Sequence, residues 1–538
     1  MRPAGWRWLA ALGLALALLT GCAGLPPRPP VVDSQALPAP NTAPTRLGRI
    51  AEATQAAARQ AAAPQPPAGP SGFRLLPTGE YAFDARAALA ALAERSIDAQ
   101  YYELHADGAG AAFLRSLRDA ARRGVRVRLL VDDFHAGPAF PLLRALAREP
   151  RVEVRLFNPL LVRSGTALGR LLWSAHEFGR VNRRMHNKLF VADNQVAIYG
   201  GRNVADEYFM RGGQANFIDL DVLSIGPVVP ALSTTFDAYW NSTHAWPVDR
   251  VPGAGAEADT GVPPPGDDPI DRLAIDTPLS LQMAPTDPLG QTSVRQQLAE
   301  GRFVLRWGNA EVTADPPSKV SDPIVLNQPS PAMRAKLDVV RRAEREVAIV
   351  NPYFVPGEVG MAIMAEAARR QVRGLIFTNS LGSTDEPLVH RAYARYRSAM
   401  LKLGMQLYEL NPEHLRESGQ YGDFGRSAAR LHVKGAVVDR RWLLVGSVNL
   451  DARSAIINTE LAVVIDCPEI TRDALAALGG DPWRTMYRVT LDADGERLRW
   501  QAINARGDAE ERPDEPQDTP WQRLVHWLQS LFIPEDQL

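Results

Sequence analysis

The sequence contains little cysteine and little lysine, and neither sign of charge predominates. Of its 538 residues only Cys22 and Cys467 are cysteines, which excludes a scaffold held together by many disulfides. The chain carries 60 Lys and Arg residues against 61 Asp and Glu residues. Proteins that bind nucleic acid usually carry a basic excess, so this balance argues against a nuclease. Only 5 of the 60 basic residues are lysines.

Two of these scarce lysines lie in a motif that occurs twice. Both copies read H-x-K-x4-D-x6-G-(G/S)-x-N, and their matched positions are 246 residues apart. A compact ammonium is kept at both places in a chain that otherwise uses arginine almost everywhere. The repeat indicates an internal duplication. The matched residues are His186, Lys188, Asp193 and Asn203 in the first copy, and His432, Lys434, Asp439 and Asn449 in the second.

The pattern within each copy predicts a β-hairpin. Polar and apolar residues alternate, and a turn at Asp193 or Asp439 leads into a second apolar run. Residues i and i+2 of a strand face the same side, so each motif histidine is expected beside its lysine. Asn203 and Asn449 follow the second strand, where a loop enters a helix and backbone amides are available for anions.

Helical and strand patterns alternate in the same order before each motif, which predicts an α/β fold. Tyr353 and Phe354 are expected to correspond to Tyr101 and Tyr102. In the first half we expect helices over 85–93 and 111–123 and strands over 96–102 and 125–131. In the second half we expect helices over 332–346 and 358–370 and strands over 347–354 and 374–379.

The two motifs resemble those of the phospholipase D superfamily. Further segments, such as Leu129-Leu130-Val131-Asp132-Asp133, are similar to bacterial cardiolipin synthases, most closely those of the C type. The resemblance covers residues from about 70 to about 490. It implies two homologous halves, each a mixed sheet flanked by helices, related by a pseudo-twofold axis through one active site.

Composition divides the chain into six segments. We expect a lipoprotein signal peptide at 1–21, a Pro/Ala-rich tether at 22–70, a first phospholipase D-like half at 71–248, a connecting segment at 249–298, a second half at 299–490, and a tail at 491–538. The tail ends in apolar residues with helical spacing. Packing on the body and lying in a lipid interface are equally good interpretations of that helix.

The N-terminus is typical of a protein sent to the bacterial cell envelope. An apolar run over residues 8–19 suits the core of a signal peptide and is shorter than the roughly 20 residues that span a bilayer. The Leu-Thr-Gly-Cys that follows resembles a lipobox, which implies cleavage before Cys22 and acylation of its sulfur. A plain signal peptide or an uncleaved anchor is the alternative. Because Ala23 rather than aspartate follows Cys22, a periplasm-facing lipoprotein of the outer membrane is preferred.

The resemblance assigns roles to the motif residues. Cleaving an anionic phosphodiester needs a nucleophile, charge neutralisation on the phosphate and an acid for the leaving alkoxide. In the family one histidine becomes a covalent phosphohistidine and the other serves as acid and then base. By family tendency His186 is the nucleophile and His432 the acid, and the reverse stays open because the motifs are nearly identical. Phosphate binding is expected from Lys188, Lys434, Asn203 and Asn449.

Four acidic residues are candidates for supporting roles. A carboxylate beside an imidazole sets its tautomer and raises its basicity. Asp219 and Glu460, each at the start of the strand after its motif, are the candidates for this orienting role. Asp193 and Asp439 complete the catalytic motif, but at the hairpin turns they are expected to fix the turn and the local field. No cofactor or metal is implied, and we find no His/Cys/carboxylate cluster with ligand spacing beyond the motifs.

The leading hypothesis is phosphatidyl transfer between phospholipids. A phosphatidylglycerol or another phospholipid gives its phosphatidyl group to His186, and the hydroxyl of a second phosphatidylglycerol takes it, giving cardiolipin. A hydrolytic phospholipase D that releases phosphatidic acid is the first alternative, and a nuclease of the same superfamily is the second. The expected partners are phospholipids and the membrane, through acylated Cys22 and the C-terminal helix, without nucleic acid. The residues give no indication of a protein partner.

Overall fold

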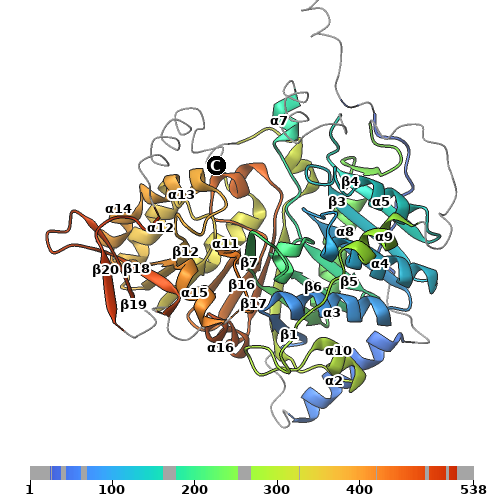
Figure 1. Ribbon diagram of the computed structural model, residues 1–538, viewed down its shortest axis with the longest axis horizontal. Helices are drawn as coiled ribbons and strands as arrows, with labels where there is room; N and C mark the ends of the chain where they lie inside the picture. Colours follow the sequence, from blue (N-terminus) through green and yellow to red (C-terminus); the bar gives the residue numbers. More distant parts are fainter. Residues whose placement is uncertain are drawn as a thin grey trace, which may run out of the picture.

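The computed structural model describes residues 25, 27–37, 44–61, 69–161, 177–252, 268–325, 328–419, 421–478, 484–503 and 508–517. Its two halves lie side by side in Figure 1, the first in blue and green and the second in yellow to red. The expected signal peptide, Cys22 and the apolar C-terminal helix lie outside the described residues. None of the described helices is long and apolar enough to cross a membrane.

The first half alternates strands and helices in the predicted order. Its strands are β1 (Ser71–Leu76), β2 (Ser96–Tyr101), β3 (Arg126–Asp132), β4 (Val152–Phe157), β5 (Leu189–Ala192), β6 (Val196–Gly200), β7 (Ala215–Ile218), β8 (Asp221–Ile225) and β9 (Ala245–Pro247). Its helices include α3 (Gly79–Leu92), α4 (Gly108–Arg122), α5 (Phe140–Ala147), α7 (Phe178–Val181), the 3-10 helix η2 (Asp206–Phe209) and α8 (Val228–Trp240).

The second half repeats this order. Its strands are β10 (Arg306–Ala314), β11 (Glu346–Val350), β12 (Arg373–Asn379), β13 (Gln406–Leu410), β14 (Ala428–Leu431), β15 (Gly435–Val438), β16 (Trp442–Gly446), β17 (Leu461–Asp466), β18 (Met486–Leu491), β19 (Leu498–Ile503) and β20 (Ala509–Arg512). Its helices include the 3-10 helix η3 (Pro317–Val320), α11 (Pro331–Arg341), α12 (Gly357–Arg369), α13 (Pro387–Ala394), α14 (Arg397–Lys402), α15 (Pro412–Ser418), the π-helix η4 (Arg453–Ile457) and α16 (Pro468–Ala477).

Eighteen of the described strands form one continuous sheet. The strand pairings give the order β9-β4-β3-β2-β5-β6-β8-β1-β10-β17-β16-β15-β11-β12-β13-β18-β19-β20. The run from β4 to β1 has the same topology as the run from β13 to β10. The two halves meet where β1 and β10 pair antiparallel, Gly72 opposite Trp307. The predicted α/β fold of two homologous mixed-sheet halves is confirmed.

The parallel strands are largely buried because helices cover them. β2, β3 and β4 pair in parallel in the first half, and β11, β12 and β13 do so in the second. Capping residues start the covering helices: Asp107 accepts a hydrogen bond from the Gly110 amide at α4, and Ser330 accepts one from Met333 at α11. One apolar cluster joins the halves, since it contains Phe73 from the first and Val463 from the second.

Residues 22–70 do not form the expected tether where the structure describes them. Residues 46–61 form helix α2 (Arg46–Ala61), which buries Leu47 and Ile50. Arg28 donates to the Ser242 and Ala245 carbonyls, and the Ser34 amide donates to Asn241. The composition reasoning did not predict this helix because it assigned alanine, the best helix former, to an extended segment.

The boundaries around the second half also need correction. The connecting segment contains two helices, α9 (Pro269–Asp276) and α10 (Val294–Ala299), and α9 packs on α4 of the first half. The second half does not end at 490, because β19 and β20 extend its sheet. Glu515 in the predicted tail accepts a hydrogen bond from Arg397 at 2.7 Å.

Candidate active site

Two parallel pairings between the halves bring the motifs together. β14, which precedes the second motif, pairs in parallel with β7 of the first half, Leu431 opposite Ile218. On the other side Met185 forms a parallel bridge with Thr459. Each pairing ends in a backbone hydrogen bond from a motif histidine: His432 N–H donates to Ile218 O at 2.7 Å, and His186 N–H to Thr459 O at 2.9 Å. The residue after each carbonyl acceptor is acidic: Asp219 follows Ile218, and Glu460 follows Thr459. Each histidine therefore lies beside an acidic residue of the other half.

The histidine–carboxylate pairs are crossed between the halves. His186 Nδ1 lies 2.9 Å from an oxygen of Glu460, and His432 Nδ1 lies 2.6 Å from Asp219. Both carboxylates are buried completely, at 0% side-chain exposure. The sequence named the two acidic residues without assigning their histidines. The structure shows that each carboxylate fixes the imidazole of the motif to which it does not belong.

The matched motif residues Gly201 and Ser447 lie against these two carboxylates. At Gly201 an added Cβ would lie 2.1 Å from an Asp219 oxygen, so only glycine fits beside that shorter carboxylate. The matched residue of the second motif, Ser447, instead donates its hydroxyl proton to Glu460. Ser454 of η4 donates to the other Glu460 oxygen at 2.6 Å. The motifs thus differ at this position because glycine is beside Asp219, whereas serine donates a hydrogen bond to Glu460.

The motif lysines lie in matched positions. Lys188 Nζ donates to the His186 carbonyl at 2.6 Å, and Lys434 Nζ to the His432 carbonyl at 2.7 Å. Each ammonium also lies over a tyrosine ring, Lys188 at 5.3 Å from the centroid of Tyr102 and Lys434 at 5.8 Å from that of Tyr353. Tyr353 therefore takes the place of Tyr102 over its lysine. The bridges of Leu104 to Val204 and of Phe354 to Leu450 match its backbone position to Glu103, so the predicted correspondence with Tyr101 is wrong.

Burial and like charge lower the pKa of the site's cations. Burial, reinforced by the charge of Lys434, lowers the pKa of Lys188 to about 7, and burial lowers that of Lys434 to about 8 despite Asp219. Burial lowers the pKa of His186 against the pull of Glu460, and burial and Lys434 lower that of His432 well below its usual value. The negative charge of a bound anion would raise these pKa values, so the site favours binding of an anion.

The motif asparagines and aspartates have different contacts from one another. The Asn203 side chain forms hydrogen bonds with protein groups: it accepts one from the Glu103 amide at 3.2 Å and donates one to the Tyr208 hydroxyl at 3.0 Å. Asn449 keeps a buried side-chain oxygen without a protein partner. Asp193 accepts from the amides of residues 94–96, and Asp439 from those of residues 344–346, at the hairpin turns. Both aspartates occupy the left-handed region, with φ of 53° and 52°.

Sequence reasoning missed the aromatic surroundings of the histidines. Tyr102 packs edge-on against His186 with centroids 5.2 Å apart, and Tyr208 packs the same way against His432 at 5.2 Å. Tyr208 follows the first motif in η2, yet it contacts the histidine of the second. A tyrosine beside an expected strand end is a weak signal, because tyrosines are also common in cores. Cys467 is fully buried at 0% exposure.

Comparison with known proteins identifies the family of this site. A family model described as "Cardiolipin synthase, PLD-like domain" matches residues 88–240 and 337–479, once in each half. The chain belongs to this cardiolipin synthase family. It is 34% identical over 464 residues to cardiolipin synthase C of Escherichia coli K12, covering 84% of this chain and 93% of that protein. The family resemblance predicted from the motifs is confirmed, and the protein is a phosphatidyltransferase of the phospholipase D type.

Two further comparisons agree with this membership. A cardiolipin synthase A of Yersinia pseudotuberculosis is 25% identical over 388 residues, which cover 70% of this chain and 62% of that protein. The crystal structure of phosphatidylserine synthase from Haemophilus influenzae Rd KW20 matches with a TM-score of 0.55 at 12% identity. The alignment covers 89% of this chain and 97% of the other. This member of the cardiolipin synthase family therefore shares the fold of that enzyme.

Proposed function

We propose that this enzyme makes cardiolipin from phosphatidylglycerol and a second phospholipid through a phosphohistidine intermediate on His186. The observation that carries the proposal is the crossed pair of buried contacts, His186 with Glu460 and His432 with Asp219. Each carboxylate accepts a hydrogen bond from Nδ1–H of its imidazole, which leaves Nε2 of both rings available to react with the substrate. Two imidazoles held in this way suit a double displacement at phosphorus.

The first half-reaction cleaves the donor lipid. Neutral His186 attacks phosphorus through Nε2, forming a P–N bond while the bond from phosphorus to the head-group alkoxide breaks. His432, protonated on Nε2, gives that proton to the leaving alkoxide. Burial and the charge of Lys434 lower the pKa of His432. An anionic phosphate beside the ring raises this pKa because the phosphate charge stabilises the imidazolium. Lys188 and Lys434 neutralise the non-bridging oxygens.

The second half-reaction uses the same groups in reverse. The hydroxyl of phosphatidylglycerol enters where the head group left, and His432 removes its proton. The P–N bond to His186 breaks as the new P–O bond forms, which releases cardiolipin and restores both imidazoles. Water in place of the hydroxyl would give phosphatidic acid, the product of the alternative hydrolytic reaction.

An apolar cavity of about 380 Å³ supports a lipid substrate. It lies between α11, α12 and strands β11 and β12, and it is lined by Phe354 and Leu450. These two residues directly follow Tyr353 and Asn449, so the cavity begins next to the second motif. A volume of this size is within the range of ligand pockets, and its lining suits an acyl chain.

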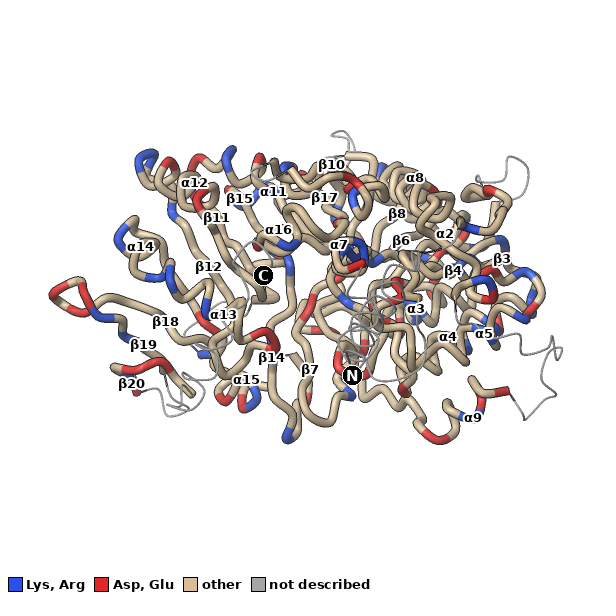
Figure 2. Tube along the Cα trace, turned by 90° about the horizontal axis from the view of Figure 1, so that it is seen from above, with Lys and Arg blue, Asp and Glu red and all other residues tan. Residues whose placement is uncertain are grey.

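The charge distribution argues against the nuclease alternative. Figure 2 shows basic and acidic positions interspersed along the described chain. A nucleic-acid groove needs many cations along one track to neutralise successive phosphates. The cations in this site are instead buried beside the two histidines, where they neutralise a single phosphate.

Thin-layer chromatography of lipid products tests the proposal. Full-length enzyme in detergent is incubated with phosphatidylglycerol, alone and mixed with a second phospholipid. We expect cardiolipin to form, and we expect His186→Ala to abolish it while the unfolding temperature stays near that of the wild type. Phosphatidic acid as the sole product would establish hydrolysis instead, and cleavage of added plasmid DNA would establish the nuclease. Undiminished cardiolipin from His186→Ala would remove that residue from the reaction.

The lipid anchor completes the proposal. Acylation of Cys22 would hold the enzyme at a periplasm-facing leaflet, with the outer membrane preferred and the C-terminal apolar helix as a second contact. Mass spectrometry of the purified protein should show an acylated N-terminal cysteine. Cys22→Ser should lose the acyl chains and shift the protein from the membrane fraction. An unmodified Cys22 in membrane-bound protein would refute this anchor.

A further inference from the structure

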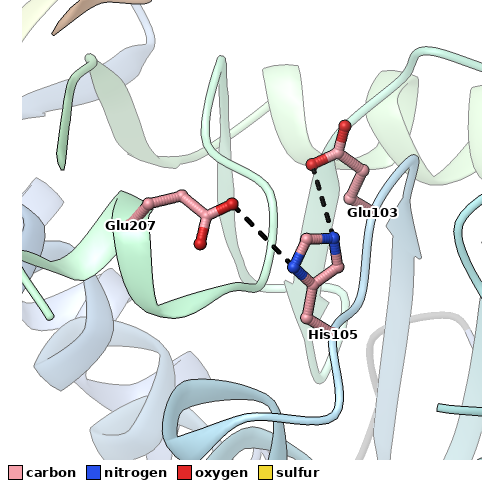
Figure 3. A group of neighbouring side chains, drawn as sticks. All are labelled: Glu103, His105 and Glu207. Atoms are coloured by element: carbon pink, nitrogen blue, oxygen red, sulfur yellow. Dashed lines mark ion pairs between the residues drawn. The ribbon is translucent and has the colours of Figure 1, made fainter. Parts of the chain in front are cut away.

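Three polar side chains of the first half face one another in Figure 3: Glu103, His105 and Glu207. Glu103 Oε2 lies 3.9 Å from His105 Nε2, and Glu207 Oε1 lies 3.8 Å from His105 Nδ1. One potential ligand atom from each residue lies within 4.8 Å of the other two. His135 extends the group, with Nε2 at 3.7 Å from the second oxygen of Glu103. The group therefore combines two imidazoles with two carboxylates.

The backbone holds this group in place. Leu104 forms a parallel bridge with Val204, and two hydrogen bonds flank it. His105 N–H donates to the Val204 carbonyl at 3.0 Å, and Val204 N–H donates to the Glu103 carbonyl at 3.1 Å. Glu207 follows in η2, so a fixed backbone carries all three of the side chains drawn in Figure 3. The side-chain exposures of 17% for Glu103, 35% for His105 and 28% for Glu207 leave them accessible to a small ion.

The cluster borders the active site. Glu103 directly follows Tyr102, whose ring packs against His186. The hydroxyl of Tyr208 lies 3.5 Å from Glu103, and its ring packs against His432. Two carboxylates beside a site for an anionic phospholipid would repel the substrate unless a cation neutralised them. The cluster thus has an electrostatic reason to bind a cation.

We propose that Glu103, His105 and Glu207 bind one divalent transition-metal ion at the edge of the active site, and that its open coordination position takes an anionic oxygen of the lipid. Imidazole combined with carboxylates suits Zn²⁺ or Mn²⁺ better than Mg²⁺, which prefers oxygen ligands and retains its waters. Ligand atoms around a tetrahedral zinc lie roughly 3.4 Å apart, so side-chain rotation must bring the three ligand atoms, now within 4.8 Å of one another, closer together around one nitrogen of His105. Three protein ligands leave a fourth position open.

The sequence did not reveal this cluster because its members come from separate segments. Glu103 and His105 follow β2, while Glu207 lies beyond the first motif in η2. The Leu104–Val204 bridge and the hydrogen bond from the Glu103 amide to Asn203 bring them together. The expectation that no ligand cluster exists outside the motifs rested on spacing along the chain alone.

Metal binding by the full-length protein tests the site directly. Protein treated with a chelator and then loaded with ZnCl₂ should retain one Zn²⁺ per chain by elemental analysis. Calorimetry should show that Glu207→Gln and His105→Asn each bind Zn²⁺ about tenfold or more weakly than the wild type. The matched control Glu358→Gln, at an exposed position of α12, should bind as the wild type does. Substoichiometric Zn²⁺, or equal affinity in all variants, would overturn the proposal.

A second measurement uses the wild-type protein, so its result does not depend on whether the variants fold. Bound Zn²⁺ should protect His105 from modification by diethyl pyrocarbonate, as read by mass spectrometry. Half-buried His244, which lies outside the cluster, should react equally with and without the metal. Equal modification of His105 in both samples would place any bound zinc elsewhere.

The role of the open position is tested without turnover, so the result is independent of the proposed reaction. Calorimetry with His186→Ala and dihexanoyl-phosphatidylglycerol is run with the site stripped and then loaded with Zn²⁺. Loading should tighten lipid binding several-fold, because the metal neutralises two carboxylates and offers a ligand position. The same experiment with His186→Ala combined with Glu207→Gln should show no change on loading. Equal lipid affinity with and without metal would refute this role.

Discussion

The crossing of the histidine–carboxylate pairs is the main feature at the scale of residues. Glu460 and Asp219 each follow a motif along the chain but orient the histidine of the other motif. The two histidines differ in their partners, since Glu460 also accepts from Ser447 and Ser454. Burial acts to raise the pKa of Glu460, but the charge and hydrogen bond of His186, the charge of Lys188 and the hydrogen bond from Ser447 lower it, whereas burial raises the pKa of Asp219.

The crossed pairs predict opposite phenotypes for two conservative substitutions. Glu460→Gln should slow formation of the phosphohistidine because the acceptor of His186 loses its negative charge, and Asp219→Asn should slow its breakdown because the acceptor of His432 does so too. Both should reduce turnover on the order of 10²- to 10⁴-fold. Quenched reactions with radiolabelled phosphatidyl donor should show protein-bound label only in Asp219→Asn. Label in Glu460→Gln alone would make His432 the nucleophile.

The lowered lysine pKa values predict the alkaline limit of activity. Lys188 and Lys434 bind phosphate as ammonium ions, which are populated below their pKa values of about 7 and about 8. Because kcat/KM reports the free enzyme, it should fall as pH rises, first as His432, whose pKa is lower, loses its proton and then more steeply through about 7 to 8 as both lysines lose theirs. On the acid side, His186 has a lowered pKa and stays neutral to below its ordinary value. Measured kcat/KM that stays constant to pH 10 would contradict this assignment.

At the scale of elements, the hairpins and the second-half helices have distinct tasks. Asp193 and Asp439 tie each hairpin turn to the loop before β2 or β11, so they fix the strands that carry the lysines without approaching the histidines. In the second half, α11 and α12 leave an apolar cavity against the sheet. In the first half, α9 and α10 add further packing on α4 and α3.

Filling the cavity should discriminate between lipids by chain length. Ala367→Phe places a ring in the cavity and should raise KM several-fold for long-chain phosphatidylglycerol, with little effect on the dihexanoyl lipid. The matched control Ala362→Phe, at an exposed position of the same helix, should change neither value. Steady-state kinetics with both lipids gives the comparison. An equal change for both lipids would show that the cavity holds no acyl chain.

At the scale of the whole molecule, the site exists only because two halves share one sheet. β10 joins them, pairing with β1 on one side and β17 on the other. The apolar cluster that spans the junction makes the halves one packing unit. Each half contributes one histidine, one lysine and the carboxylate that serves the other half.

This arrangement predicts that inactive variants do not complement each other. His186→Ala and His432→Ala should each be inactive, and a mixture of the two full-length proteins should stay inactive because both histidines come from one chain. The assay is phospholipid turnover after mixing and, separately, after co-expression. Recovered activity would mean that the site is assembled between subunits rather than within one chain.

The sequence alone determined the α/β class, the two halves and the motif residues, because duplicated spacing and alternating patterns are local properties of the chain. It also placed Asp193 and Asp439 at turns, since their position between two apolar runs demands one. Only the tertiary structure decided which carboxylate serves which histidine, that Tyr208 contacts the second motif, and that Glu103, His105 and Glu207 meet. Those contacts depend on the parallel pairings between β7 and β14 and around Met185 and Leu104. Register between distant strands is set by packing of the whole fold, which no local pattern encodes.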